Sequence, residues 1–530
     1  MHAAVLAVPP ALARAIPRLA SFLPEWQLVP AGAAPAGATL GWLAGLPGRP
    51  VGQGSLLMLA EGPWAPPSFG RRLTPLGLVL TISPGGVADP VTTGMTNPTE
   101  ARATTQVPDL SAMLTLVPRL PALAALLAGS DLPPEQALAR LLAASRFVDP
   151  FHGKPWTAPQ ALAQLAEWTT AEAANRRIVA ATGMETFKRP RMRARLANGA
   201  GSPRMFWRAS AAIQHAADQQ GAVVVWAAAM PPDLPARAAA ANVPLVQIED
   251  GFIRSAGLGV MLAPAQSLVM DARGAHFDPA TPSALECQLA TAEFSPALLA
   301  RSAALRERLL ADGITKYNLI GPAPALKPPA GRKRVLVCGQ VEDDASLRRG
   351  GGSIRTNLDL LRAARRENPD AWLVYKPHPD VEAGIRRGII RPDALAVLAD
   401  QVAADSPIAP LYDLADEVQV MSSLAGFEAL LRGCRVVCWG QPFYAGWGLT
   451  QDRAPIPRRT RRLSLDELVA GTLLLYPRYW DPVSGLPCPL EVLLDRLSNM
   501  APPPPPRLPR WLRQAAARAS GWWTLFWVRR

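Results

Sequence analysis

The chain has 530 residues, of which 49 % are hydrophobic and 18 % charged, and its formal net charge at pH 7 is +13. This composition excludes a disordered chain, and the length predicts two or three domains. The positive charge favours anionic partners such as nucleotides, acidic sugars, phospholipids or nucleic acid. Nucleic acid is disfavoured, because the sequence contains no helix-turn-helix signature, no zinc-ligand spacing and no aromatic RNA-binding motif.

The start of the chain and its cysteines favour a cytoplasmic protein. Residues 1–19 contain three prolines and lack the charged and apolar regions of a signal peptide. The sequence has no run of about 18 apolar residues, the length that predicts a membrane-spanning helix. The five cysteines are scattered without a CxxC pair, which is typical of reduced thiols and gives no metal-binding pattern.

The first part of the chain repeats a later part in shortened form. At an offset of 189 positions, acidic residues, glycines and prolines coincide: Glu61-Gly62 with Asp250-Gly251, Gly70 with Gly259, and Asp89-Pro90 with Asp278-Pro279. At an offset of 332 positions, Asp149-Pro150 coincides with Asp481-Pro482. The first copy therefore lacks 332 − 189 = 143 residues. We expect residues 1–155 to form a degenerate, truncated module used for packing, dimerisation or acceptor docking.

Residues 156–500 alternate short apolar runs with amphipathic segments. The candidate buried strands are 223–227, 245–248, 335–338, 372–375, 418–421 and 436–439, and the amphipathic segments include 358–366 and 425–432. This alternation predicts an α/β fold with parallel sheets covered by helices. A proline-rich stretch at 322–329 predicts a boundary. We therefore expect two Rossmann-like domains, 156–325 and 326–500, that face a cleft.

The first polar cluster follows the predicted strand 245–248. It begins with Glu249, Asp250 and Gly251. Adjacent carboxylates raise the pKa of one of the pair, which suits acid/base catalysis. Arg254 is placed to bind a substrate carboxylate in bidentate fashion. The alternative is an ion pair between aspartate and arginine that only closes the loop.

A second cluster, Gln340 to Ser346, follows the predicted strand 335–338. It includes Asp343 and Asp344, either of which is a candidate nucleophile, while its carboxylates together are candidate cation ligands. The cluster matches neither a P-loop nor a dinucleotide-binding fingerprint, so ATP and NAD are disfavoured.

Two further clusters follow the next predicted strands. In the first, which runs from Lys376 to Asp380, prolines flank His378 and present it for a phosphate or a ribose, or leave it as a surface histidine in a turn. In the second, Ser422 and Ser423 precede a predicted helix. Hydroxyls and backbone N–H groups there can bind an anion, whereas the alternative is a simple helix cap.

Residues from about 160 to 495 closely resemble one module of the bacterial capsule-export proteins that act as retaining β-Kdo glycosyltransferases, where Kdo is 3-deoxy-D-manno-oct-2-ulosonic acid. The resemblance rests on EDGFIRSAGLG, TKYN, GQVEDDAS, YKPHPDVEAG, SSLAGFEALLRG, GQPFYAGWGLT and YPRYWDP. It implies a GT-B-like fold of two Rossmann-like domains. It also implies transfer of Kdo from CMP-β-Kdo to a phosphatidylglycerol-type lipid acceptor that already carries Kdo.

The resemblance also implies roles for particular residues. Retention of configuration requires two displacements or shielding of one face. Asp344 is then the expected nucleophile, with Asp343 left open, and Asp250 or Glu249 is the acid/base. The expected nucleotide- and substrate-binding residues are Arg254, Gln340, Lys376, His378, Pro379, Ser422, Ser423 and Glu428, of which Arg254 would meet the sugar carboxylate. Neither a cofactor nor a metal is expected, because histidine and a helix N-terminus can neutralise the single phosphate of CMP.

The end of the chain predicts a membrane surface as a partner. Residues 501–530 begin with a proline-rich spacer and end in a basic, tryptophan-rich stretch. Such a stretch lies in the membrane interface, or else packs against a core. We therefore expect peripheral association with the inner face of the cytoplasmic membrane, with a glycolipid acceptor and other capsule assembly proteins as partners. A transferase that uses another CMP-sugar, such as sialic acid, and an inactive assembly scaffold are the alternatives.

Overall fold

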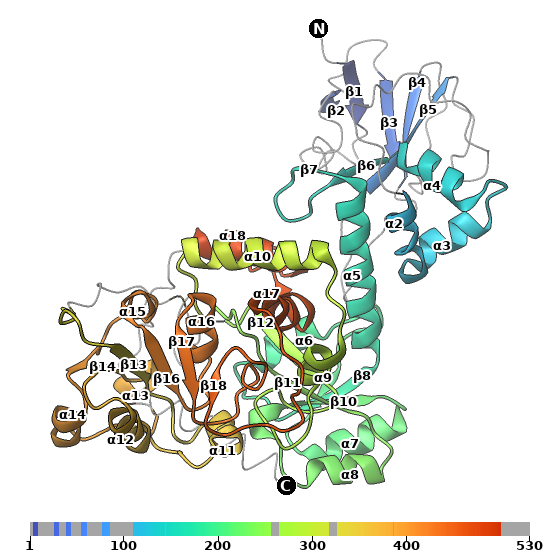
Figure 1. Cartoon of the computed structure of the whole chain (residues 1–530). Helices are drawn as coiled ribbons and strands as arrows, with labels where there is room; N and C mark the ends of the chain where they lie inside the picture. The colour runs from blue at the N-terminus through green and yellow to red at the C-terminus, as the bar shows by residue number, and fades with distance from the viewer. Residues whose placement is uncertain are drawn as a thin grey trace. The chain divides into compact units, whose positions relative to one another are not determined.

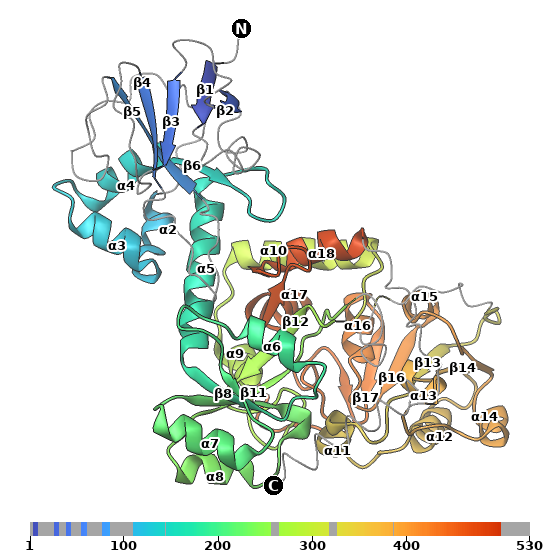
Figure 2. The same cartoon turned by 180° about the vertical axis from the view of Figure 1, so that it is seen from behind.

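In the computed structural model, the described residues are 4–8, 26–30, 39–43, 55–60 and 77–84, for which only the backbone is given, and 110–499 except 144, 256–263, 317, 319–325 and 385. The predicted membrane-surface tail, 501–530, lies outside them, as do most of the matching residues in the first copy of the repeat. The chain divides into two compact units (Figures 1 and 2). Unit 1 is Met1–Arg177 with Met192–Ser202, and unit 2 is Ile178–Arg191 with Pro203–Arg530.

Unit 1 contains a seven-stranded sheet of order β2-β1-β3-β4-β5-β6-β7. Its strands are β1 (Ala4–Val8), β2 (Trp26–Pro30), β3 (Thr39–Leu43), β4 (Ser55–Ala60), β5 (Gly77–Pro84), β6 (Ser145–Val148) and β7 (Pro155–Trp156). Its helices are α2 (Leu110–Leu114), η4 (Val117–Arg119), α3 (Pro121–Ala128), α4 (Pro134–Ala143) and α5 (Ala158–Arg176). Among the described helices, none alone has the length and hydropathy of a membrane span, and one pair bent by 112°, Leu110–Arg119 with Pro121–Ala128, meets both criteria together.

The first sheet of unit 2 has the order β20-β19-β12-β11-β10-β8-β9. Its strands are β8 (Ile178–Thr182), β9 (Arg204–Met205), β10 (Ala222–Trp226), β11 (Leu245–Asp250), β12 (Ser267–Asp271), β19 (Pro477–Trp480) and β20 (Pro487–Cys488). Every residue of β10 is buried, as expected for an apolar central strand with helices on its faces. The helices that accompany this sheet are α7 (Ala209–Asp218), η5 (Ala227–Ala229), α8 (Leu234–Ala240), α9 (Ala284–Thr291) and α10 (Pro296–Ala311), and α6 (Arg189–Arg195) precedes β9.

The sheet of unit 1 repeats this arrangement strand for strand. In each sheet four strands are parallel neighbours, and the next three are added antiparallel. The hairpin turns at the end of the two sheets also agree. The Gly153 amide donates to the Asp149 carbonyl at 2.9 Å, and the Gly485 amide donates to the Asp481 carbonyl at 2.7 Å. The two copies therefore share a topology that the sparse sequence matches indicated.

The second sheet of unit 2 is entirely parallel, with the order β15-β14-β13-β16-β17-β18. Its strands are β13 (Arg334–Cys338), β14 (Trp372–Lys376), β15 (Gln401–Val402), β16 (Glu417–Val420), β17 (Arg435–Cys438) and β18 (Gln451–Asp452). Its helices are α11 (Ala345–Gly350), α12 (Asn357–Glu367), α13 (Pro379–Glu382), α14 (Pro392–Leu398), α15 (Ala409–Leu414) and α16 (Ala425–Leu431). The predicted α/β class with Rossmann-like domains is confirmed.

Residues 465–499 return to the first sheet of unit 2. β19 pairs with β12, and the following helix α18 (Leu490–Ser498) lies beside α10 in both views (Figures 1 and 2). Arg301 on α10 binds Glu491 on α18 at 2.7 Å. The short α17 (Leu465–Val469) and a π-helix, η7 (Ala470–Leu475), lead into this return. The stretch 326–500 therefore does not fold as one continuous domain, because β12 takes its second neighbour from residues 477–480.

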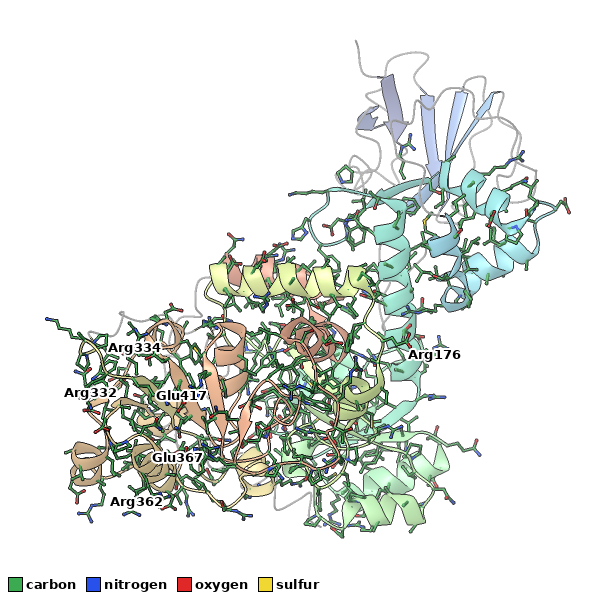
Figure 3. All side chains as sticks on the ribbon, in the orientation of Figure 1. Arg176, Arg332, Arg334, Arg362, Glu367 and Glu417 are labelled. Carbon is green, nitrogen blue, oxygen red and sulfur yellow. The ribbon has the colours of Figure 1, made fainter. Side chains whose placement is uncertain are left out.

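Charged residues at the amino-terminal edge of the all-parallel sheet bind one another. Lys333 Nζ lies 2.8 Å from Glu417 Oε2, and Arg332 Nη2 lies 3.2 Å from Asp400 Oδ1. Figure 3 shows Arg332, Arg334 and Glu417 at this edge. The chemistry-bearing clusters follow the strands and so lie at the opposite, carboxyl edge.

Candidate active site

A cavity of about 350 Å³ lies in unit 2 where the carboxyl ends of β11, β13, β14 and β16 meet. All of the predicted site residues line it except Arg254 and the alternative nucleophile Asp343. Loops at the carboxyl ends of parallel strands share one edge of a sheet, and the two sheets bring these edges together here. The residues separated by more than 170 positions in the sequence, from Glu249 to Ser423, therefore meet at one site.

Glu249 and Asp250 end strand β11, and their pKa values are pushed apart. Burial, followed by the charge of Asp250, raises the pKa of Glu249 to about 7. Burial also works to raise the pKa of Asp250, but the charges of Arg254 and Lys188 outweigh it, so that the pKa lies below its ordinary value. Two neighbouring carboxyl groups with opposite shifts can serve as a proton-transfer group and a permanent anion. Of the two, Glu249 is suited to proton transfer near neutral pH.

Arg254 lies behind Asp250 and does not line the cavity. Its Nε donates to Asp250 Oδ2 at 2.6 Å, and its Nη1 donates to Ser255 Oγ at 2.9 Å. Only 4 % of the residue is exposed. The structure thus shows the loop-closing ion pair that was the alternative interpretation of this motif. The expected contact of Arg254 with a sugar carboxylate stays a prediction.

Asp344 and Asp343 differ in position although they are adjacent. Asp344 lines the cavity and caps α11, where its Oδ2 accepts hydrogen bonds from the amide and the hydroxyl of Ser346. Asp343 is exposed and binds Arg386 at 3.1 Å. The geometry therefore favours Asp344 over Asp343 as the carboxylate that meets a substrate.

Gln340 and the two serines join the loops that follow β13 and β16. The Gln340 side chain donates to Ser422 Oγ at 3.0 Å and accepts from the Ser422 amide at 3.2 Å. Ser423 Oγ accepts from the Ala425 amide at 3.2 Å, so Ser423 also caps the first turn of α16. Both hydroxyls line the cavity. Ser423 therefore both binds the first amide of α16 and lines the cavity.

The cluster after β14 contains a neutral imidazole and a buried ion pair. His378 Nδ1 accepts from the Asp380 amide at 3.1 Å, which places the proton of the neutral ring on Nε2. Burial, followed by the charge of Lys316, lowers the His378 pKa to about 4. Lys376 Nζ binds Glu382 at 2.8 Å. Pro379 occupies the first position of α13, where its missing N–H group is not needed.

Glu428 fixes a segment that the sequence analysis did not count among the site residues. Its Oε1 accepts from the Lys316 amide at 2.8 Å, and its Oε2 accepts from the Tyr412 hydroxyl at 2.9 Å. Lys316 itself lines the cavity. The TKYN motif, noted above as part of the family resemblance, was the signal that could have identified it.

Two other cavity residues were not among the predicted site residues. Asp380 Oδ1 and His276 Nδ1 are buried and have no hydrogen-bond partner among the described residues. Burial raises the Asp380 pKa to about 6 and lowers the His276 pKa to about 3. Buried polar atoms of this kind usually have partners. They are therefore candidate contacts for a ligand. Within the described part of the chain, no group of three or more His, Cys, Asp or Glu residues is arranged to hold a metal ion.

Comparisons with known proteins place this site in a family context. The family described as "Capsule polysaccharide biosynthesis protein" matches residues 221–311 and 323–479. The capsule polysaccharide modification protein LipA of Neisseria meningitidis serogroup A is 51 % identical over 241 residues, which are 46 % of this chain and 34 % of LipA. The lipopolysaccharide-processing protein LpsZ of Rhizobium meliloti is 44 % identical over 241 residues, 45 % of this chain and 55 % of LpsZ. The chain thus spans about a third of LipA and about half of LpsZ.

A solved structure is similar over nearly its whole length. Thermosulfurimonas dismutans KpsC, a beta Kdo 2,7 transferase, has 34 % sequence identity and a TM-score of 0.50, covering 60 % of this chain and 98 % of the KpsC chain. The family model covers the residues that line the cavity except Gly313, Thr315 and Lys316, which lie between its two matched ranges. On these grounds the chain belongs to the capsule polysaccharide biosynthesis family that includes the Kdo transferase KpsC.

Proposed function

We propose that the chain is a retaining glycosyltransferase that moves Kdo from CMP-β-Kdo to a lipid acceptor that already carries Kdo, in the synthesis of a capsule linker. The observation that carries this proposal is that one cavity of about 350 Å³ brings together the carboxyl groups of Glu249, Asp250 and Asp344, the neutral imidazole of His378, and Ser422 and Ser423. The likeness to a beta Kdo 2,7 transferase supports the choice of sugar.

In the proposed first step, the Asp344 carboxylate attacks the anomeric carbon of Kdo. A C–O bond forms to Asp344 as the C–O bond to the CMP phosphate breaks, and CMP leaves with the electron pair. The bonds from Ser346 to Asp344 Oδ2 hold the carboxylate in position. Inversion in this step produces a glycosyl adduct on Asp344.

In the second step, the acceptor hydroxyl attacks the same carbon from the opposite face. Glu249 takes the hydroxyl proton as the new C–O bond forms and the Asp344 carboxylate leaves, so the two inversions give net retention. A pKa of about 7 lets Glu249 be ionised near neutral pH and still hold a proton once it has taken one. Asp250, tied to Arg254, keeps its negative charge beside it.

The CMP part would bind to the loops after β14 and β16. The Nε2–H group of His378 and the hydroxyls of Ser422 and Ser423 can donate hydrogen bonds to phosphate oxygens. Gln340 holds the Ser422 loop against the Asp344 loop, so the leaving group and the nucleophile are positioned by one hydrogen-bond network. The proposal needs no resident cofactor, since the donor carries the leaving group.

The partners follow from this reaction and remain part of the proposal. The acceptor would be a phosphatidylglycerol-type glycolipid at the inner face of the cytoplasmic membrane. The protein would lie at that surface as a peripheral protein, and other capsule assembly proteins would supply and accept the lipid. The net charge of +13 favours an anionic membrane surface.

A single incubation tests the reaction. Purified protein is mixed with CMP-Kdo and a short synthetic acceptor that ends in β-Kdo, and the product is read by NMR. We expect a new β-linkage, and no product with Asp344→Ala. The matched control is Asp343→Ala, which removes a neighbouring carboxylate that does not line the cavity. Mass spectrometry with donor alone should show a sugar adduct on Asp344.

Three outcomes would contradict the proposal in different ways. Turnover of CMP-sialic acid without turnover of CMP-Kdo would assign another donor. An α-linked product would exclude double displacement. Binding of donor without any transfer, under conditions where KpsC transfers Kdo, would favour an inactive scaffold.

A further inference from the structure

Thr315 and Asn318, two residues of the TKYN motif, bind each other beside the cavity. The Thr315 amide donates to Asn318 Oδ1 at 2.9 Å, and the Asn318 amide donates to Thr315 Oγ1 at 3.2 Å. Asn318 has a φ of 49°, a left-handed conformation that asparagine adopts more readily than most residues. Its side chain also donates to the Ser255 carbonyl at 3.0 Å. These bonds fix Thr315 and Asn318 to each other and to the loop that follows β11.

Both halves of the site hold the backbone of Lys316. Its amide donates to Glu428 Oε1 on α16 at 2.8 Å. Its carbonyl accepts from the amides of Arg254 and Ser255, after β11, at 3.1 and 3.4 Å. The base of this side chain is thus tied to the carboxyl edges of both sheets. A side chain on such a support can position a substrate group with little freedom.

The charge of Lys316 reaches groups on several sides of the cavity. Burial has the largest effect on the pKa of each of these groups, and beside it the charge of Lys316 works to lower the pKa of Asp250 at the end of β11, of His276 after β12, and of His378 and Asp380 after β14. Lys316 itself lines the cavity. Because its backbone is bound by Glu428 on α16 and by the amides that follow β11, Lys316 lies where a donor substrate would bridge the two domains.

We propose that Lys316 is a positioning residue that binds an oxyanion of the donor, either the sugar carboxylate or the phosphate, and holds the anomeric carbon against Asp344. This inference rests on the proposed function. A donor of that class brings two anionic groups into a cavity that already contains the carboxyl groups of Asp344 and Asp250. A fixed cation is needed there to offset the repulsion.

The test compares Lys316→Met and Lys316→Arg with the control Lys327→Met, which alters an exposed lysine away from the cavity. Calorimetry gives Kd for CMP, which carries the phosphate alone, and steady-state kinetics give KM for CMP-Kdo. We expect Lys316→Met to weaken one or both by about 10- to 100-fold, the effect of one charge-assisted hydrogen bond. Lys316→Arg should recover most of this loss, and Lys327→Met should match wild type.

The two arms identify the oxyanion. Weaker CMP binding assigns Lys316 to the phosphate, whereas unchanged CMP binding with a raised KM for CMP-Kdo assigns it to the sugar carboxylate. A separate readout needs no turnover: NMR titration should give a higher His378 pKa in Lys316→Met than in wild type or Lys327→Met. If Lys316→Met does not fold, Lys316→Gln replaces it in every measurement.

The outcomes also separate this inference from the proposed function. Wild-type values of Kd, KM and the His378 pKa in a folded Lys316→Met variant would overturn the role of Lys316 alone. A wild-type chain that binds CMP but transfers no sugar would overturn the proposed function, while the loss of CMP affinity in Lys316→Met would still support phosphate binding by Lys316. A wild-type chain that binds neither CMP nor CMP-Kdo would refute both.

Discussion

Replacing Glu249 with glutamine is expected to stabilise the folded chain at alkaline pH and to destabilise it at acid pH. Folding raises the pKa of Glu249 from 4.5 to about 7, mainly because the carboxyl group is buried. Between these two values the folded chain holds a proton that the unfolded chain has lost. Stability therefore falls as the pH rises through this window, and the full penalty remains above pH 7.

The expected change in stability follows from the pKa shift of Glu249 and from the two hydrogen bonds that its carboxyl oxygens accept. A pKa displaced from 4.5 to about 7 corresponds to about 3 kcal/mol of lost stability at high pH. Glutamine removes this loss, but it has one acceptor oxygen, whereas the Glu249 oxygens accept from the Ala228 and Asp250 amides at 3.3 and 3.2 Å. One lost hydrogen bond costs about 1 kcal/mol. We therefore expect a net gain of about 2 kcal/mol at pH 8.5 and a net loss of about 1 kcal/mol at pH 4.5.

Urea denaturation followed by tryptophan fluorescence at pH 4.5 and 8.5 measures this reversal of sign. Glu307→Gln, which changes an exposed glutamate on α10, is the control and should change stability little at either pH. The same Glu249→Gln variant should lose transfer activity, and the wild-type rate should rise as the pH passes through about 7, since the base must be ionised. A Glu249→Gln variant that differs from wild type by the same amount at both pH values would refute the reasoning.

Three further substitutions address how the site is held. Arg459→Met should lower the free energy of unfolding, measured by urea denaturation, by about 3 kcal/mol. The reason is that the buried Arg459 binds Glu286 at 2.8 Å as well as backbone carbonyls. Unchanged stability would show that this ion pair is dispensable. Gly251→Ala should leave the chain folded, as measured by circular dichroism, but lower the transfer rate at least about tenfold. The added Cβ would overlap the Ser267 side chain and displace the end of β11. A wild-type transfer rate would contradict this prediction. His378→Asn retains a hydrogen-bond acceptor for the first turn of α13, so its melting temperature should stay near that of wild type. Calorimetry should show CMP binding about tenfold weaker than in wild type. Equal CMP affinity would exclude His378 from the nucleotide site.

The strands of the all-parallel sheet could be predicted closely from the sequence. The expected strand 335–338 is observed as Arg334–Cys338, and the expected strand 418–421 as Glu417–Val420. Central strands of a parallel sheet are buried on both faces, so the sequence of each is a short apolar run that ends in polar residues. The same local signal placed Asp344, His378 and Ser423 after strands, at the edge where the cavity lies. The repeat was also recognisable, because turn residues such as Asp149 and Asp481 keep the same local geometry in both copies.

The tertiary structure alone decided which charged residues face the cavity. Arg254 and Lys316 are both basic residues in loops, yet the cavity is lined by Lys316, while Arg254 binds Asp250 behind it. Asp343 and Asp344 are chemically identical neighbours, and the start of α11 turns one toward Arg386 and the other toward the cavity. The pairing of β19 with β12 could likewise not be predicted from the sequence. Apolar patterns along a sequence report local burial, whereas ion-pair choice and antiparallel pairing across about 200 residues depend on which distant segments meet in the folded chain.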